Sequence, residues 1–143
     1  MNSDKTFSWP IRIYYEDTDA GGVVFYANYL KFFERARTEW LRSLGYNQQA
    51  LANTLGLLFV VKKAAIEYYA PARLDDELKL VVVVERVGGA SIQLRQEAWR
   101  MSGGQATLLA DGMVTVVGVN MENFRPCPIP DDIRSKLHVQ GEH

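Results

Sequence analysis

Two aspartates stand one residue apart, directly ahead of a glycine pair and a predicted helix. The stretch YEDTDAGGVVF (residues 15–25) contains Asp17 and Asp19. The simplest explanation is structural, because acidic and glycine residues form turns and compensate the charge of a helix start. A turn does not need two carboxylates, however, and Asn28 is already a suitable N-cap for the helix. The spare carboxylates therefore identify a candidate active site.

A carboxylate beside the exposed amides of a helix start could catalyse hydrolysis at a carbonyl group. The amides and the helix dipole polarise the carbonyl and stabilise the oxyanion that develops on it. The carboxylate attacks the carbonyl carbon, or deprotonates a water that does so. A thiol has a pKa of about 8.5, so a thiolate leaves without help from a general acid. No histidine precedes the C-terminal tail, and the pattern therefore favours thioester over amide hydrolysis.

The sequence does not support a calcium-binding loop, a cysteine nucleophile or a nucleotide-binding motif. A calcium-binding EF-hand loop that begins at Asp17 fails at two ligand positions, where Gly21 and Asn28 stand. The single cysteine, Cys127, lies among prolines without a histidine to activate it. The two histidines lie in the tail, and neither the P-loop nor the dinucleotide-binding glycine motif occurs. We predict neither a metal site nor a bound cofactor.

The composition is that of one ordinary globular domain. The 143 residues are 48% hydrophobic and 23% charged, and 16 basic and 17 acidic side chains give a net charge of −1. Nucleic-acid binding requires a concentrated basic face, which is not visible. The longest wholly aliphatic run, residues 80–84, is far too short to span a membrane, and the N-terminus lacks a signal pattern. We expect one domain over residues 1–143, with a core at about 8–130, in a soluble cytoplasmic protein.

A long helix is predicted directly after the acidic loop. Apolar side chains recur at spacings of three and four residues and form one stripe, made of Tyr29, Phe33, Ala36, Trp40 and Leu44. Asn28 as N-cap and Gly45 as C′ residue bound this helix. Two pairs of opposite charge, Glu34 with Arg37 and Glu39 with Arg42, are expected on its surface. The stripe is wide enough to indicate that another element wraps around the helix.

Most of the remaining chain has the pattern of strands. Residues 9–15 alternate as a half-buried strand, in which Pro10 requires a position near the start or on an edge, and the residues before it are predicted to be loose. A short helix over 47–56 precedes four more strands, at 58–69, 77–87, 91–101 and 108–120. Gly-Gly pairs between these strands favour antiparallel hairpins. Because the long helix is the only sizeable element that could cover the sheet, the predicted class is α+β.

Two blocks of the sequence carry a family resemblance. The segment IRIYYEDTDAGGVVFYANYLKFFERARTEWLR (residues 11–42) resembles the hydroxybenzoyl-CoA thioesterase family of hot-dog proteins, in particular its Tol–Pal system-associated acyl-CoA thioesterases. IEYYAPARLDDEL (residues 66–78) matches the same subgroup. The resemblance covers roughly residues 8–130. It implies a hot-dog fold, in which a five-stranded antiparallel sheet wraps a long central helix, and an acyl-CoA thioesterase activity.

The resemblance also implies roles for single residues. Asp19, the second acid of the pair, matches the family's nucleophile or general base, and Asp17 supports the loop. A backbone N–H at Tyr26 or its immediate neighbour matches the oxyanion donor. Tyr26 itself stands where many members of the subgroup have histidine, which leaves the acyl specificity open. Gly22 and Val23, in the same loop, are expected to contact the substrate.

Further candidates lie on the strands. The resemblance implies contacts with the coenzyme A part of the substrate for Lys63, Arg86, Gly89 and Ser91. For Lys63 and its neighbour Lys62, which alternate sides of one strand, solvated positions are the competing interpretation. Glu67, Tyr68 and Tyr69 could line the pocket, although strand aromatics more often belong to a core.

The implied partners are an acyl-CoA substrate and further copies of the chain. Family members form dimers, and often tetramers, with the site at the subunit interface, and coenzyme A is their leaving group. The alternative function is a non-catalytic binding or scaffold protein of the Tol–Pal or phospholipid-synthesis machinery, with acyl carrier protein as a candidate partner. A hot-dog dehydratase would need a histidine near the helix, and none precedes His138.

Overall fold

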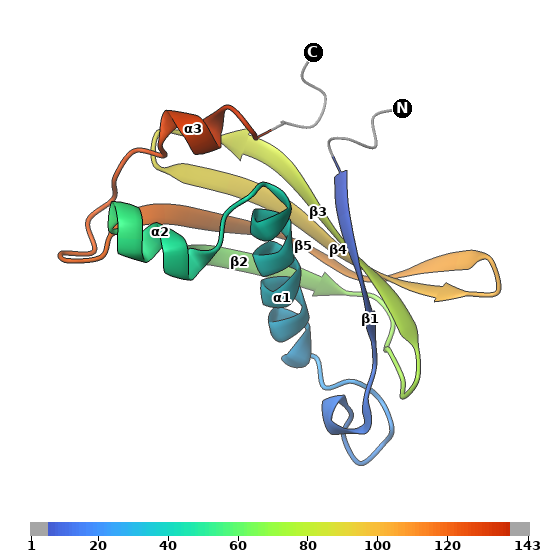
Figure 1. The fold of residues 1–143 in the computed structure, drawn as a ribbon. Coiled ribbons are helices and arrows are strands. Elements are labelled where there is room, and N and C mark those ends of the chain that lie inside the picture. Colours follow the sequence, from blue (N-terminus) through green and yellow to red (C-terminus); the bar gives the residue numbers. More distant parts are fainter. Residues whose placement is uncertain (1–5, 138–143) are drawn as a thin grey trace.

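A computed structural model describes residues 6–137 (Figure 1). The elements follow in the order β1 (Thr6–Arg12), the short 3₁₀ helix η2 (Tyr15–Asp17), α1 (Asn28–Ser43), α2 (Gln48–Leu55), β2 (Leu57–Tyr68), β3 (Glu77–Val87), β4 (Ser91–Ser102), β5 (Gln105–Asn120) and α3 (Asp131–Arg134). One strand, a long helix, a short helix and four strands were predicted in this order, and the order is confirmed.

All five strands form one antiparallel sheet in the order β1-β3-β4-β5-β2. The two Gly-Gly pairs connect β3 to β4 and β4 to β5, as predicted, because each pair joins strands that are neighbours in the sheet. The connections that are not hairpins place β1 and β2 at the two edges. Pro10 therefore lies on an edge strand, where a residue without an N–H is tolerated.

The core lies between α1 and one face of the sheet (Figure 1). Helix α1 buries four of the five residues of the predicted stripe, together with Phe32 and Leu41, against apolar side chains of the sheet such as Leu80, Leu94 and Val114. The fifth, Leu44, is the C-cap and is partly buried. This burial removes most of the apolar surface of the helix from water, which is the main stabilising term of such a layer. The expected α+β architecture, a long helix covered by a five-stranded antiparallel sheet, is confirmed.

The first strand differs from its prediction. It begins at Thr6 and ends at Arg12, so residues 6 and 7 are ordered in the sheet and Phe7 packs against the core. Tyr15, the last residue of the strand predicted over 9–15, is instead 81% exposed in η2. The strand ends early because Asp17 accepts the Tyr14 N–H at 2.9 Å and turns the chain out of the sheet.

The caps of the helices are partly as predicted. Gly45 (φ +98°) follows the C-cap Leu44 of α1, as predicted, and Gly56 (φ +64°) closes α2 in the left-handed conformation that glycine favours. The prediction of Asn28 as N-cap is wrong: Ala27 occupies that position, and Asn28 is the first helical residue. The Asn28 side-chain amide instead donates to the Asp17 carbonyl at 2.9 Å, which ties η2 to α1.

Some expectations concern ligands or the chain ends. Within residues 6–137, no helix combines the length and apolar character that crossing a membrane requires. No cluster of three His, Cys, Asp or Glu side chains suited to a metal ion occurs in that same part of the chain. His138 and His143 lie outside the described residues.

Candidate active site

The loop that carries Asp19 is closed by its own hydrogen bonds. The Asp19 N–H donates to the Val23 carbonyl at 2.9 Å, and the Asp19 carbonyl accepts the Gly22 N–H at 3.0 Å. One carboxylate oxygen, Oδ1, accepts the N–H groups of Gly21 at 2.8 Å and Val23 at 3.4 Å. Gly22 has φ +81°, which favours glycine there. The other oxygen, Oδ2, accepts no hydrogen bond from the described chain, so it is free to act on a ligand.

The two aspartates have different environments. Asp17 accepts two hydrogen bonds of 2.9 Å. Its carboxylate accepts one from the Tyr14 N–H, and its backbone carbonyl accepts one from the side-chain amide of Asn28. The Asp17 carboxylate therefore caps η2 and does not line the cleft described below, whereas Asp19 lines it. Sequence spacing alone did not separate these roles.

A second segment, residues 70–76, braces the Asp19 loop. The Val24 N–H donates to the Ala72 carbonyl at 2.8 Å, and Val23 forms an isolated antiparallel bridge with Arg73. The Ala72 N–H in turn donates to the hydroxyl of Tyr29 on α1 at 3.2 Å. Arg100 on β4 donates to the Pro71 carbonyl at 3.2 Å. The position of the Asp19 loop therefore depends on α1 and β4 through this segment.

The start of α1 offers free amide donors. Its first turn is formed by donation from Asn28 N–H to Phe25 carbonyl at 2.8 Å, and from Tyr29 N–H to Tyr26 carbonyl at 3.1 Å. The N–H groups of Tyr26 and Ala27 have no acceptor among residues 6–137, and no side chain caps this end of the helix. These two donors at the positive end of the helix dipole are suited to a developing negative charge.

An open cleft of about 510 Å³ brings the loop and the helix start together. It is lined by Asp19, Val23, Val24, Phe25, Tyr26, Tyr29, Tyr68, Tyr69, Ala70 and Pro71. Three of the predicted site residues, Asp19, Val23 and Tyr26, thus share one cleft, and Gly22 shapes the loop beside it. The rings of Tyr26 and Tyr29 each pack edge to face on Tyr68, with centroids 5.6 and 5.5 Å apart.

The cleft has one acid and a wall of neutral phenols. Burial raises the pKa of Tyr29, and burial with the neighbouring Tyr26 raises the pKa of Tyr68. Both tyrosines therefore stay protonated near neutral pH. Asp19 is the only carboxylate among the described residues that line the cleft. A carboxylate facing an apolar cleft with free amide donors is suited to attack on an activated carbonyl.

The remaining candidates lie outside this cleft in a single chain. Lys63 lies on β2 and Arg86 on β3. Gly89 lies in the β3–β4 turn, and Ser91 is the first residue of β4. The Gly89 carbonyl accepts Arg134 of α3 at 2.9 Å. In Figure 1, α3 lies at the end of the sheet opposite the loop between β1 and α1. One chain therefore does not bring Arg86, Gly89 and Ser91 to Asp19, and Lys63 does not line the cleft.

Sequence reasoning assigned part of the cleft to the core. Tyr29 was predicted as one member of the apolar stripe, yet its hydroxyl holds Ala72 and its ring lines the cleft. Tyr68 and Tyr69 line the cleft and are 42% and 56% exposed, while Glu67 does not line it. Ala70 and Pro71 were not singled out. Their position directly after two strand tyrosines was the available signal.

Comparisons with known proteins identify the family of this chain. The model of the Thioesterase-like superfamily matches residues 14–137. The acyl-CoA thioesterase YbgC of Haemophilus influenzae is 44% identical over 135 residues, which cover 94% of this chain and 96% of that protein. A probable thioesterase from Bartonella henselae is 34% identical with a TM-score of 0.78, covering 87% of this chain and 99% of that one.

A more distant structure supports the fold. A mutant 4-hydroxybenzoyl-CoA thioesterase in complex with 4-hydroxybenzoyl-CoA is 19% identical, with a TM-score of 0.87 over 94% of this chain and 99% of that one. At that identity the likeness concerns the fold alone, and it confirms the hot-dog architecture expected from the sequence. Matched over most of its length, the chain belongs to the Thioesterase-like superfamily.

Proposed function

We propose that this protein is an acyl-CoA thioesterase, which hydrolyses an acyl-CoA to a free acid and coenzyme A. The observation that carries the proposal is the free Oδ2 of Asp19, in a cleft whose wall includes Tyr26 at the uncapped start of α1. The relatives named as acyl-CoA thioesterases support it, since the similarity extends over nearly the whole chain.

The chemistry needs only groups that the cleft supplies. The thioester carbonyl oxygen accepts a hydrogen bond from the N–H of Tyr26 or Ala27, which stabilises the oxyanion. Asp19 either attacks the carbonyl carbon to form an anhydride, which water then cleaves, or removes a proton from an attacking water. In both routes the carbon–sulfur bond breaks, the thiolate leaves with the electron pair, and it takes up a proton. Coenzyme A is a leaving group here and not a resident cofactor.

The same proposal includes assembly into a homodimer or homotetramer with sites between subunits. It is supported by the separation of Arg86, Gly89 and Ser91 from Asp19 within one chain. Edge strand β2 also presents an exposed stretch over residues 61–65, which includes Lys63. Sedimentation gives the oligomeric state. Mixing a variant changed at Asp19 with one changed at Arg86 should restore part of the activity if each site uses both chains.

The decisive experiment compares two isosteric variants. Release of free thiol is measured over a panel of acyl-CoA substrates for wild type, Asp19→Asn and Asp17→Asn. We expect Asp19→Asn to lose about 10²–10⁴-fold in kcat, the range typical of a general base. Asp17→Asn should lose less, because its carboxylate binds the backbone of η2 and not the cleft. Circular dichroism and thermal melting check that both variants are folded.

Two outcomes would contradict the proposal. Wild-type turnover by folded Asp19→Asn would remove Asp19 from the mechanism. Absence of turnover on every acyl-CoA, together with a stable complex with acyl carrier protein or a Tol–Pal component, would support the scaffold function instead. Incorporation of oxygen-18 from water into Asp19 under single turnover would demonstrate direct attack, with water then cleaving the anhydride at the Asp19 carboxyl carbon.

A further inference from the structure

Arg37 on α1 does not form the surface ion pair that its spacing predicts. The expected pair Glu39–Arg42 forms at 2.8 Å, but Arg37 makes no ion pair within the described chain. Its guanidinium instead donates to the side-chain oxygen of Gln96 at 2.8 Å. Gln96 is fully buried, and its amide donates to the Phe33 carbonyl at 3.0 Å. The prediction for Glu34 and Arg37 is wrong because this buried amide draws the guanidinium inward.

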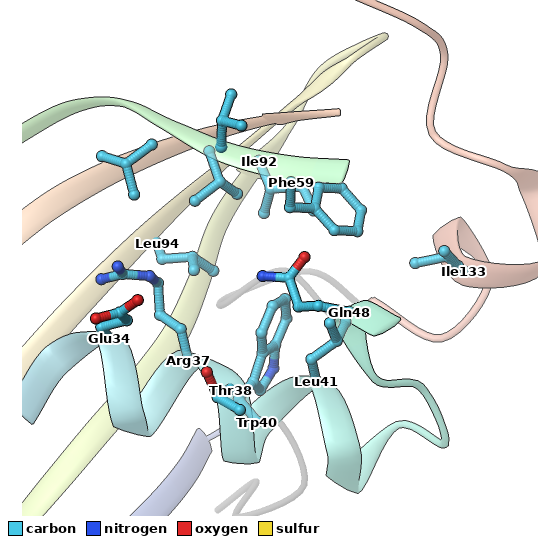
Figure 2. Close-up of a pocket in the computed structure, with 13 residues that line it drawn as sticks. Glu34, Arg37, Thr38, Trp40, Leu41, Gln48, Phe59, Ile92, Leu94 and Ile133 are labelled. Carbon is cyan, nitrogen blue, oxygen red and sulfur yellow. The ribbon is translucent and has the colours of Figure 1, made fainter. Parts of the chain in front are cut away.

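The Arg37 side chain borders a second cavity, which we call the α1–α2 cavity. It has a volume of about 310 Å³ and lies between α1, α2 and the sheet (Figure 2). Its walls are mostly apolar and include Trp40, Leu41, Phe59, Ile92 and Leu94. It shares no lining residue with the Asp19 cleft. The α1–α2 cavity is therefore a separate volume with its own chemistry.

The charge of this cavity selects a class of ligand. Arg37 has five N–H donors, and Gln96 is the only hydrogen-bond acceptor that it finds among the described residues. Arg37 forms no ion pair within 4.0 Å in the described chain, and such a partly buried guanidinium attracts an anion, whose carboxylate matches its planar fork. Burial lowers the pKa of Arg37 from its ordinary value, but an arginine remains charged at neutral pH.

The volume limits the size of that ligand. One water occupies about 30 Å³ in the liquid, so 310 Å³ corresponds to about ten non-hydrogen atoms. Octanoate and a hydroxybenzoate each have about this size. We propose that the α1–α2 cavity binds a free monocarboxylic acid, with the carboxylate on Arg37 and the apolar body between Trp40, Phe59 and Leu94. The acid is of the product class of the proposed reaction, but the binding does not depend on that function.

Glu34 and Arg37 should have opposite effects on the binding of a carboxylate. It lies one helical turn before Arg37 and borders the same cavity (Figure 2). Its negative charge interacts favourably with Arg37 and raises the pKa of the guanidinium, against the effect of burial. The same charge repels an incoming carboxylate. Removing it should therefore strengthen acid binding, while removing Arg37 weakens it.

The experiment titrates octanoate into the full-length protein by calorimetry and follows tryptophan fluorescence. The matched probe is 1-octanol, which has the same chain and no carboxylate. We expect octanoate to bind more tightly than 1-octanol. Arg37→Met should weaken octanoate binding about tenfold or more, the loss expected for a hydrogen bond to a charged group, and Glu34→Gln should strengthen it. Trp40→Phe should retain the heat but lose most of the fluorescence change.

Other outcomes would overturn the proposal. Equal affinities for octanoate and 1-octanol would remove the role of the charge, as would equal affinities in Arg37→Met and Glu34→Gln. Arg37→Met with unchanged octanoate affinity and a weakened dimer in sedimentation would show that Arg37 faces a second copy of the chain. Asp19→Asn should bind octanoate as wild type does, so failure of the thioesterase proposal and failure of this one are distinguishable.

Discussion

Replacing Tyr29 with phenylalanine should destabilise the protein by removing one acceptor. The Tyr29 hydroxyl accepts the Ala72 N–H at 3.2 Å, and the two residues are 2% and 0% exposed. Water does not reach the N–H that Tyr29→Phe leaves without a partner. Leaving such a buried donor unsatisfied costs about 1–3 kcal/mol of unfolding free energy. For a domain of this length that corresponds to a drop in Tm of roughly 3–10 °C.

The matched control is Tyr68→Phe, in the same aromatic cluster. Its hydroxyl makes no hydrogen bond within the described residues, and the side chain is 42% exposed. We expect a change in unfolding free energy below about 0.5 kcal/mol there. Urea denaturation at neutral pH measures both variants, with equal m-values as a check on two-state behaviour. Equal destabilisation of the two variants would refute the assignment to the Ala72 N–H.

The pH dependence gives a second test of the same side chain. Burial raises the pKa of Tyr29 in the folded protein above its ordinary value of 10.0. The unfolded chain therefore ionises first, and stability is lost as the pH rises from about 10 through the folded pKa. Tyr29→Phe lacks this group, so its unfolding free energy should fall less steeply over that alkaline range. Chemical denaturation at a series of pH values compares the two slopes.

If the Tyr26 N–H is the oxyanion donor, Ala27→Pro should leave turnover within about tenfold of the wild-type rate, because the variant removes only the Ala27 N–H and the φ of −66° suits proline. Thermal melting checks the fold, because proline also disfavours a helical conformation of Tyr26 before it. A folded variant that loses about a hundredfold or more in kcat would instead assign the oxyanion contact to Ala27 and not to Tyr26. Gly112→Ala should destabilise the protein by about 1–3 kcal/mol, since its Cβ would overlap the Ala65 carbonyl oxygen on β2. Urea denaturation of Gly89→Ala is the comparison, because no atom lies within 4 Å of a Cβ there; equal losses would contradict the steric explanation.

The strands and hairpins were predictable because their signals are local. Alternating aliphatic residues fix which face of a strand is buried, and Gly-Gly pairs mark where β3 turns into β4 and β4 into β5. The α1 stripe was predictable for the same reason, since helical spacing alone places Tyr29 and Trp40 on one face. The error at Asn28 has a different origin. Its side chain had a competing partner, the Asp17 carbonyl, which only the folded loop brings within reach.

The sequence predicted the Asp19 loop of the candidate site but not the opposite wall of the cleft. Asp19 stands out by residue type, but its free oxygen follows from bonds that its own loop makes to Oδ1. The opposite wall, at Tyr68 and Pro71, comes from a segment distant in the sequence, and no local pattern links the two. The predicted ion pair between Glu34 and Arg37 was wrong for a related reason. Helical spacing indicated Glu34 as the partner of Arg37, whereas the folded sheet brings Gln96 within hydrogen-bond distance.

The bracing of the acidic loop by residues 70–76 limits how this cleft can be engineered. The loop does not hold its conformation alone, because the Val24 N–H donates to the Ala72 carbonyl and Val23 forms a β-bridge with Arg73. A chimaera that takes residues 15–27 alone from a relative would therefore not match residues 70–76, and its carboxylate would be misplaced. Transplanting both segments together, with the tyrosine at position 29 that anchors them, is the smallest exchange that carries the geometry intact.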